Sequence, residues 1–355
     1  MEQIAKGCFL VPRPREMDRI GVWGFGSVAR DVVVFLVDEG LGKEIVFYSR
    51  PLPQYPNRAA AWIEDLKANA PKRQRLFGTN RVEDMAGLDV IFVGVGVPRK
   101  EGQSRRDLLA VNTEIIAQTC LEIRRLYGSC DPDKLPVLIF MGNPVTTMTW
   151  VGYKVTGFPR EKVMGQAGNL DSKRISYAIA KELGISGREV RGIVFGDHGD
   201  SMVVSSRFFS VGGIPLDLFL EVSNVDRARI QEIVEEAKRG GTHFVEATGH
   251  SASVGPAKAA GEMLRAIIMG EAEVQPVVAI LKGEYGLVKE EDGIDSMGFG
   301  VPAKIGPGGV EKIYELEVPD IREDLERSAA PIKEDTRAAA RILEERFGLK
   351  VTERA

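Results

Sequence analysis

The stretch that most constrains the fold begins at residue 19, where an apolar run leads into a glycine turn and then into a helical pattern. Residues 19–23 predict a short strand, and GFGSVA at 24–29 opens a helix that continues to Glu39. A dinucleotide-binding fingerprint requires this order of strand, glycine turn and helix. Gly24 permits the tight turn, and Gly26 lets the backbone approach a pyrophosphate, whose charge the helix N-terminus favours. The alternative is an ordinary strand-to-helix turn of an α/β protein.

The end of the second expected strand bears on the cofactor. This strand covers 44–48, and Ser49 and Arg50 follow it. A cofactor with a free ribose 2′-hydroxyl is usually held here by Asp or Glu, which this chain lacks. Ser49 can donate a hydrogen bond, and Arg50 could pair with a 2′-phosphate, so we favour NADP over NAD. In the alternative, Arg50 is solvated and the pocket accepts both cofactors.

The further pattern predicts the α/β class. Buried apolar runs at 89–96 and 137–141 are typical of parallel strands that helices cover on both faces. Alternating strands and helices predict a Rossmann-type doubly wound parallel sheet, which an α+β substrate domain follows. We therefore expect an N-terminal extension (1–18), a dinucleotide-binding domain (19–160) and a substrate domain (161–355).

Composition excludes several classes of function. With 44% hydrophobic residues, 28% charged residues and a net charge of −4, the chain has the composition of a soluble globular protein without the basic excess of a nucleic-acid binder. Apolar runs of membrane-spanning length and a signal peptide are missing from the sequence. Its three cysteines show neither ligand nor disulfide spacing. We therefore expect a cytoplasmic protein without a bound metal.

His198 is the candidate proton carrier. It is one of three histidines and lies in GDHGDS at 196–201, between expected strands at 190–195 and 202–209. An imidazole at a strand end exchanges a proton near neutral pH, although a histidine satisfied in a turn is the simpler alternative. Asp171 and Arg174 share one face of an expected helix. They could orient the imidazole and hold a substrate carboxylate, or they could form a plain ion pair.

Two more polar features lie near expected strand ends. The basic loop 97–107 could act as a mobile lid whose arginines bind a carboxylate, or it could be a solvated loop. Asn112 falls on the inward stripe of the following helix, which suggests a contact with ligand or with backbone. Asn143 follows the strand at 137–141, at the edge where open α/β sheets bind ligands.

Several of these stretches resemble, in order, the L-lactate/L-malate dehydrogenase family and especially its lactate-dehydrogenase-like malate dehydrogenases. Together they span nearly the whole chain. They are GFGSVA at 24–29, GVPRKEGQSRRDLL at 96–109, NPVTTMTWVGYKVTGFP at 143–159, GQAGNLDSKR at 165–174, GDHGDS at 196–201 and GVPAKIGPGGVEKIYEL at 300–316.

The resemblance implies a role for each site residue. His198 matches the residue that exchanges the hydroxyl proton, and Asp171 matches its orienting partner. Arg174 matches the arginine that clamps the C1 carboxylate, and Arg105 matches the lid arginine that polarises the carbonyl. Asn143 matches a contact to both substrate and nicotinamide ribose. The cofactor-binding set that we expect from motif and resemblance is Gly24, Gly26, Ser27, Val28, Ser49, Arg50, Gly94, Asn112, Met141, Asn143 and Ser251.

The resemblance also implies the substrate. In this family the residue six before the lid arginine contacts the far end of the 2-oxo acid, and an arginine there, here Arg99, goes with malate. With pyruvate the charge of Arg99 would stay unpaired in a closed site, which is costly. We therefore expect interconversion of malate and oxaloacetate, with a lactate or other 2-hydroxy acid dehydrogenase and a non-catalytic NAD(P) sensor as alternatives. The family forms homodimers and homotetramers, so we expect self-association.

Overall fold

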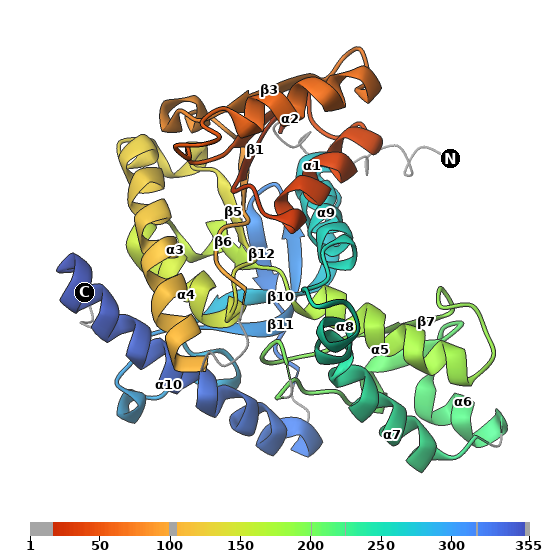
Figure 1. Cartoon of the computed structure of the whole chain (residues 1–355). Coiled ribbons are helices and arrows are strands. Elements are labelled where there is room, and N and C mark those ends of the chain that lie inside the picture. Colours follow the sequence, from red (N-terminus) through yellow and green to blue (C-terminus); the bar gives the residue numbers. More distant parts are fainter. Residues whose placement is uncertain (1–16, 99–104, 200, 224, 317–318, 352–355) are drawn as a thin grey trace, which may run out of the picture.

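A nine-stranded sheet forms the centre of the computed structural model, which describes residues 17–98, 105–199, 201–223, 225–316 and 319–351 (Figure 1). Its strands are β1 (Arg19–Trp23), β2 (Glu44–Tyr48), β3 (Arg75–Thr79), β4 (Val90–Val93), β5 (Val137–Phe140), β6 (Val163–Gly165), β10 (Glu273–Leu281), β11 (Met297–Gly306) and β12 (Gly309–Ile313). Their order across the sheet is β12-β11-β10-β6-β5-β4-β1-β2-β3. Strands β1 to β6 pair in parallel, and β10 to β12 add an antiparallel extension.

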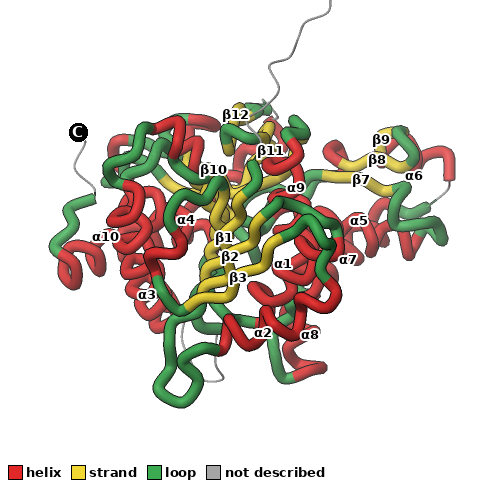
Figure 2. Tube along the Cα trace, turned by 90° about the horizontal axis from the view of Figure 1, so that it is seen from above, coloured by secondary structure: helices red, strands yellow, loops and turns green. Residues whose placement is uncertain are grey.

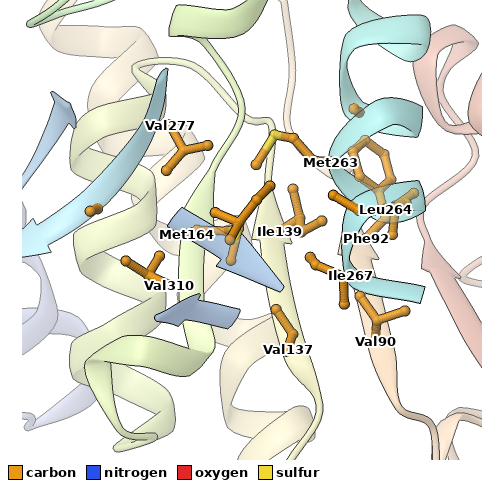
Figure 3. Packing of buried hydrophobic residues seen from close by; sticks show 14 of the residues in the cluster. Val90, Phe92, Val137, Ile139, Met164, Met263, Leu264, Ile267, Val277 and Val310 are labelled. Atoms are coloured by element: carbon orange, nitrogen blue, oxygen red, sulfur yellow. The ribbon is translucent and has the colours of Figure 1, made fainter. Parts of the chain in front are cut away.

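Helices cover both faces of this sheet. The helices concerned are α1 (Ser27–Asp38), α2 (Arg58–Leu66), α3 (Arg105–Tyr127), α4 (Val145–Thr156), α9 (Val254–Met269) and α10 (Arg322–Phe347). Figure 1 shows α3, α4 and α10 on one side and α1 and α9 on the other. Figure 3 shows how α9 presents Met263, Leu264 and Ile267 to Phe92 of β4 and Ile139 of β5. Strands buried on both faces explain the continuous apolar runs of the sequence.

A smaller unit packs beside this body. It combines α5 (Gly168–Glu182), α6 (Leu216–Ser223), α7 (Arg227–Lys238) and a sheet of β7 (Val190–Gly192), β8 (Phe209–Val211) and β9 (Ile214–Pro215). These elements share a hydrophobic cluster of their own. Figure 2 shows the small sheet and α6 standing away from the large sheet. Helix α8 (Gly240–Thr248) follows α7 and leads toward α9.

The α/β class and the doubly wound parallel sheet that the sequence predicts are confirmed. Of the strands expected on either side of His198, the first (190–195) was predicted too long, and the second (202–209) was misplaced, because β8 begins only at Phe209. β7 ends at Gly192, and only the isolated bridge between Phe195 and Val203 continues the pairing. The backbone turns at Gly196, where φ is +87°, and Gly196 pairs instead with Gly300 of β11.

The described part of the chain contains no helix that is both long and apolar enough to cross a membrane.

Candidate active site

The glycine turn and two further loops meet at one edge of the sheet. Trp23 of β1 pairs with Val93 of β4, which in turn pairs with Phe140 of β5. The next residues, Gly24, Gly94 and Met141, therefore lie side by side beyond the carboxyl ends of three parallel strands. The Gly94 N–H donates to Trp23 O at 2.9 Å, and the Met141 N–H donates to Val93 O at 3.3 Å. This edge is where open α/β sheets bind ligands.

The turn at Gly24 is shaped for close approach by a ligand. Gly24 has a φ of +123°, and a Cβ there would lie 2.7 Å from Gly94 O. A Cβ on Gly26 would lie 3.9 Å from the nearest atom, so the space above Gly26 is open. Gly26 caps α1 without a side-chain hydrogen bond, and the exposed Ser27 and half-buried Val28 form the first turn. The first amides of α1 are thus available to an anion, which fits a pyrophosphate.

Ser49 follows β2 as expected, but its hydroxyl is already used inside the protein. The side chain is 1% exposed and donates to Arg50 O at 3.3 Å. It also accepts a hydrogen bond from Nε of Arg58, a residue that the sequence did not single out. The side chain of Arg50 is exposed. Two arginines therefore flank the place where a carboxylate holds the ribose in many dinucleotide-binding domains.

Asn112 joins two loops of this edge. Its side chain is completely buried; Nδ2 donates to Val97 O at 3.1 Å and to Asn143 O at 2.7 Å. Its Oδ1 accepts from the Val97 N–H at 2.8 Å. The geometry thus matches the backbone alternative for Asn112, while a direct contact with cofactor stays a prediction. Asn143 itself is exposed at the end of β5.

His198 and Asp171 form the chemical centre of the site. Nδ1 of His198 lies 2.7 Å from Oδ2 of Asp171. The carboxylate is 2% exposed and the imidazole 27% exposed, so a ligand can reach the ring while its partner is shielded. Because a carboxylate accepts hydrogen bonds, Nδ1–H of His198 is the donor, and Nε2 keeps its lone pair in the neutral ring. This geometry fits an orienting carboxylate beside a proton carrier.

The charge of Asp171 governs the protonation of His198. It raises the pKa of His198 above its ordinary value, burial opposes this, and the hydrogen bond to Asp171 adds to the rise. The charge of Arg174 lowers the same pKa and that of Asp197 raises it, both with smaller effect. The imidazolium is therefore favoured to a higher pH than in a free histidine.

The loop that carries His198 is tied to four elements. Ser172 of α5 accepts a hydrogen bond from the Val194 N–H at 3.0 Å. Gly196 exchanges two backbone hydrogen bonds with Gly300 of β11, at 2.9 and 3.0 Å. The Asp197 N–H donates to Ser328 Oγ of α10 at 3.1 Å. Thr146 Oγ1 of α4 donates to the carboxylate of Asp197 at 3.1 Å, which completes the anchoring.

Arg174 lies beside His198 and Asp171 but makes no hydrogen bond to the Asp171 carboxylate. Its Nη1 is 3.9 Å from Oδ1 of Asp171, which is too long for a hydrogen bond, and its side chain is 30% exposed. Nη1 also lies 3.8 Å from the position that a Cβ on Gly241 of α8 would take. The guanidinium therefore stands between α5 and α8 and keeps donors for an incoming carboxylate.

Two of the predicted site arginines fall partly or wholly outside the described residues. Arg99 and the following residues to 104 lie outside the described part of the chain, as does the side chain of Arg105 at the start of α3. Ser251 is exposed in the loop between α8 and α9, where its carbonyl lies 3.3 Å from Nδ1 of His250. Among the described residues, no group of three or more His, Cys, Asp or Glu side chains could hold a metal ion.

Several residues that build the site were missed by sequence reasoning. Asp197 stands in the GDHGDS motif, so its position beside His198 could have been noticed. Ser172 is likewise adjacent to Asp171. Thr146 lies in the family-like stretch at 143–159, but nothing in that stretch links it to Asp197, and Ser328 is an ordinary hydroxyl residue of a helix far away in the sequence.

Two family models match nearly the whole chain. The NAD binding domain of lactate/malate dehydrogenase matches residues 18–165, and the alpha/beta C-terminal domain of the same family matches residues 168–342. The chain is 35% identical over 331 residues to the malate dehydrogenase of Salinibacter ruber, covering 92% of this chain and 98% of that relative. The solved malate dehydrogenase from Aeropyrum pernix covers 90% of this chain and 97% of its own, with 32% identity and a TM-score of 0.80. The lactate dehydrogenase from Cryptosporidium parvum, solved with lactic acid and nicotinamide adenine dinucleotide, has a TM-score of 0.80 at 27% identity and covers 92% of this chain and 98% of its own.

Proposed function

Because this chain belongs to the lactate/malate dehydrogenase family, we propose that it is a malate dehydrogenase, an oxidoreductase that interconverts L-malate and oxaloacetate. The observation that carries the proposal is the 2.7 Å contact between Nδ1 of His198 and Oδ2 of Asp171, with the guanidinium of Arg174 beside it. The relatives that are malate dehydrogenases at about one-third identity support the choice of malate.

The geometry of His198 determines where the hydroxyl proton of the substrate goes. In the oxidation of malate, Nε2 of the neutral imidazole accepts the proton of the C2 hydroxyl while the C2–H bond breaks and the C2–O double bond forms. When bound, the nicotinamide cofactor supplies the acceptor for the hydride that leaves C2. Asp171 stabilises the imidazolium that results, because its buried carboxylate holds Nδ1–H. In the reverse direction His198 begins protonated and returns the proton to the carbonyl oxygen.

Substrate binding is assigned to three arginines. Arg174 holds the C1 carboxylate through the donors that its long contact with Asp171 leaves available. Arg105 stabilises the charge that develops on the carbonyl oxygen, and Arg99 pairs with the second carboxylate of malate. The roles of Arg99 and Arg105 rest on the resemblance of residues 96–109 to the family. Asn143 contacts substrate and nicotinamide ribose in this assignment, and Ser251 lies near the nicotinamide.

The cofactor is a nicotinamide dinucleotide, for which the glycine turn after β1 and the open first turn of α1 provide a fitting cradle. The cofactor-binding set is the one expected from the sequence, and Ser49 and Arg50 lie at its adenosine end. We propose a preference for NADP over NAD, because Ser49 stands where an acid would otherwise hold the ribose. A carboxylate there would repel a 2′-phosphate, and a serine does not.

The absorbance of the reduced cofactor at 340 nm tests both the proposed substrate and the proposed cofactor preference. Oxaloacetate should be reduced faster than pyruvate, and NADPH should be used faster than NADH at equal low concentration. Replacing His198 by Asn should remove most turnover while cofactor still binds, because the proton carrier is lost and the cradle is not. Near-normal turnover of that variant would contradict the mechanism. Binding of cofactor without oxidation by the native protein would favour a sensor.

We also propose that the chain associates with itself. Helix α8 has no buried residue, although it carries Phe244 and Val245, which are 39% and 42% exposed. The nearby Val254 of α9 is 61% exposed. A second copy could cover these exposed apolar side chains. Sedimentation velocity should give a dimer or tetramer, and a monomer at micromolar concentration would refute the proposal.

A further inference from the structure

The end of β2 holds a group of arginines without acidic partners. Arg30 of α1, Arg50 after β2 and Arg58 of α2 form no salt bridge within the described residues. Nε of Arg30 is buried and has no hydrogen-bond partner there. The guanidinium carbons of Arg58 and Arg30 lie 4.8 Å and 5.6 Å from the ring centre of Phe25, inside the glycine turn. Two unpaired cations, Arg30 and Arg58, beside a nucleotide cradle indicate an anionic ligand.

Arg58 is held in place by two contacts that leave its charge free. Its Nε donates to Ser49 Oγ, and its guanidinium lies over the ring of Phe25. Its Nη2 makes only a long contact of 3.5 Å with Arg50 O. Stacking on an aromatic ring and bonding through Nε leave the N–H groups of the terminal nitrogens directed outward in the guanidinium plane. Such a fork matches the oxygens of a phosphate.

Arg50 is placed differently. Its side chain is exposed and, within the described residues, stacks on no aromatic ring. Tyr48 belongs to the hydrophobic cluster on the α3 side of the sheet, whereas Phe47 belongs to the cluster on the α1 side. Phe47 stacks on Phe25 at 5.4 Å between ring centres. The side that carries the glycine turn is therefore the side of Ser49 and Arg58.

We infer that Arg58 binds the 2′-phosphate of NADP, and that Ser49 acts by positioning Arg58 rather than by contacting the phosphate. The inference rests on the proposed preference for NADP. Ser49 is suited to positioning because its buried hydroxyl accepts from Arg58 and donates to Arg50 O, so that no proton of this hydroxyl remains for a ligand. A phosphate monoester carries a charge of about −1.5 to −2 at neutral pH and three acceptor oxygens. Arg30 adds positive charge beside the same ring of Phe25.

Calorimetric binding of two cofactor fragments tests the inference without turnover. Adenosine 2′,5′-bisphosphate carries the 2′-phosphate, and adenosine 5′-monophosphate lacks it. The native protein should bind the bisphosphate more tightly. Arg58→Ala should reduce this advantage roughly 10- to 100-fold, as expected for lost hydrogen bonds to a charged group, while binding of the monophosphate stays nearly unchanged. Ser49→Ala should give a smaller loss of the same kind, because Arg58 remains but is less well held.

Arg73→Ala is the matched control, since it removes an exposed arginine from a turn that contributes nothing to this pocket. It should leave both affinities unchanged. Arg58→Lys preserves the charge and checks that any loss of binding is not a loss of folding. Its unfolding temperature should equal that of the native protein, and it should still bind the bisphosphate somewhat more tightly than the monophosphate.

The alternative outcomes are distinguishable. If Arg58→Ala keeps the full advantage and Arg50→Ala loses it, Arg50 is the phosphate ligand, and this inference is overturned while the NADP preference stands. If the native protein binds both fragments equally, the NADP preference itself fails.

Discussion

Replacing Asp171 by Asn is the sharpest test of how His198 is tuned. The change keeps the shape of a side chain that is 2% exposed and removes its negative charge. The contact it alters is the 2.7 Å hydrogen bond between Oδ2 and Nδ1 of His198. Because the charge of Asp171 is the largest influence on the pKa of His198 and raises it, the pKa must fall in the variant.

The size of the fall in pKa follows from the free energy of the hydrogen bond between His198 and Asp171. A hydrogen bond to a charged group contributes about 1.5–3 kcal/mol, and about 1.4 kcal/mol corresponds to a tenfold change in an equilibrium. Above its pKa, the imidazolium of His198 should therefore be roughly 10- to 150-fold less populated in the variant. Reduction of oxaloacetate begins from the imidazolium, so its kcat/KM should fall by a similar factor at neutral to alkaline pH. Oxidation of malate begins from the neutral ring and loses less from this cause.

The assay is the pH dependence of kcat/KM in both directions, which reports groups of the free enzyme. In the native protein, reduction should decline as pH rises through the raised pKa of His198, and oxidation should decline as pH falls through it. In the Asp171→Asn variant both limbs should move to lower pH. Asp197→Asn is the control, because Asp197 also raises this pKa but has the smallest influence. Limbs that stay in place while the rate drops uniformly would show that Asp171 only orients the ring.

The glycine turn and the loop junction give two further predictions. Gly26→Ala should fold normally but weaken dinucleotide binding measured by calorimetry, because the added methyl group enters the open space of the cradle. Gly24→Ala should also lower the free energy of unfolding by about 1–3 kcal/mol, since the φ of Gly24 is +123° and the methyl group would meet Gly94 O. Asn112→Ala should cost about 1–3 kcal/mol in urea unfolding, because a fully buried side chain is removed and with it three hydrogen bonds to the backbone of Val97 and Asn143. An unchanged midpoint would refute this structural role.

The elements that the sequence predicted well are those whose signal is local. The helix expected to run from the glycine turn to Glu39 is α1, Ser27–Asp38, because its apolar positions repeat at helical spacing toward the sheet. Helix α8 was not predicted, since none of its residues is buried and it therefore has no apolar stripe to recognise. The strands around His198 were predicted wrongly, the first too long and the second misplaced, because apolar residues flank a loop that is fixed by Gly300, which lies far away in the sequence.

The site likewise contains residues that could be predicted from the sequence and residues that could not. His198, Asp171 and Arg174 could be predicted because each lies in a short stretch that resembles the family, and the structure brings the three together. The hydroxyls of Thr146 and Ser328 that hold the histidine loop could not, because their partner Asp197 lies on a different element and no spacing links them. Local pattern identifies the groups that do chemistry, and tertiary contacts identify the groups that hold them.

Ser49 shows why both kinds of information are needed to reason about the cofactor. Its hydroxyl accepts from Arg58, which begins α2 nine residues later, and a serine at this place fixes a guanidinium without neutralising it. An acid at the same position would pair with Arg58 and also repel a 2′-phosphate, so both consequences would oppose NADP. The missing acid and the unpaired arginine are therefore one feature. A sequence comparison that examines only the end of β2 detects the missing acid. It does not detect Arg58, because only the fold brings this residue to Ser49.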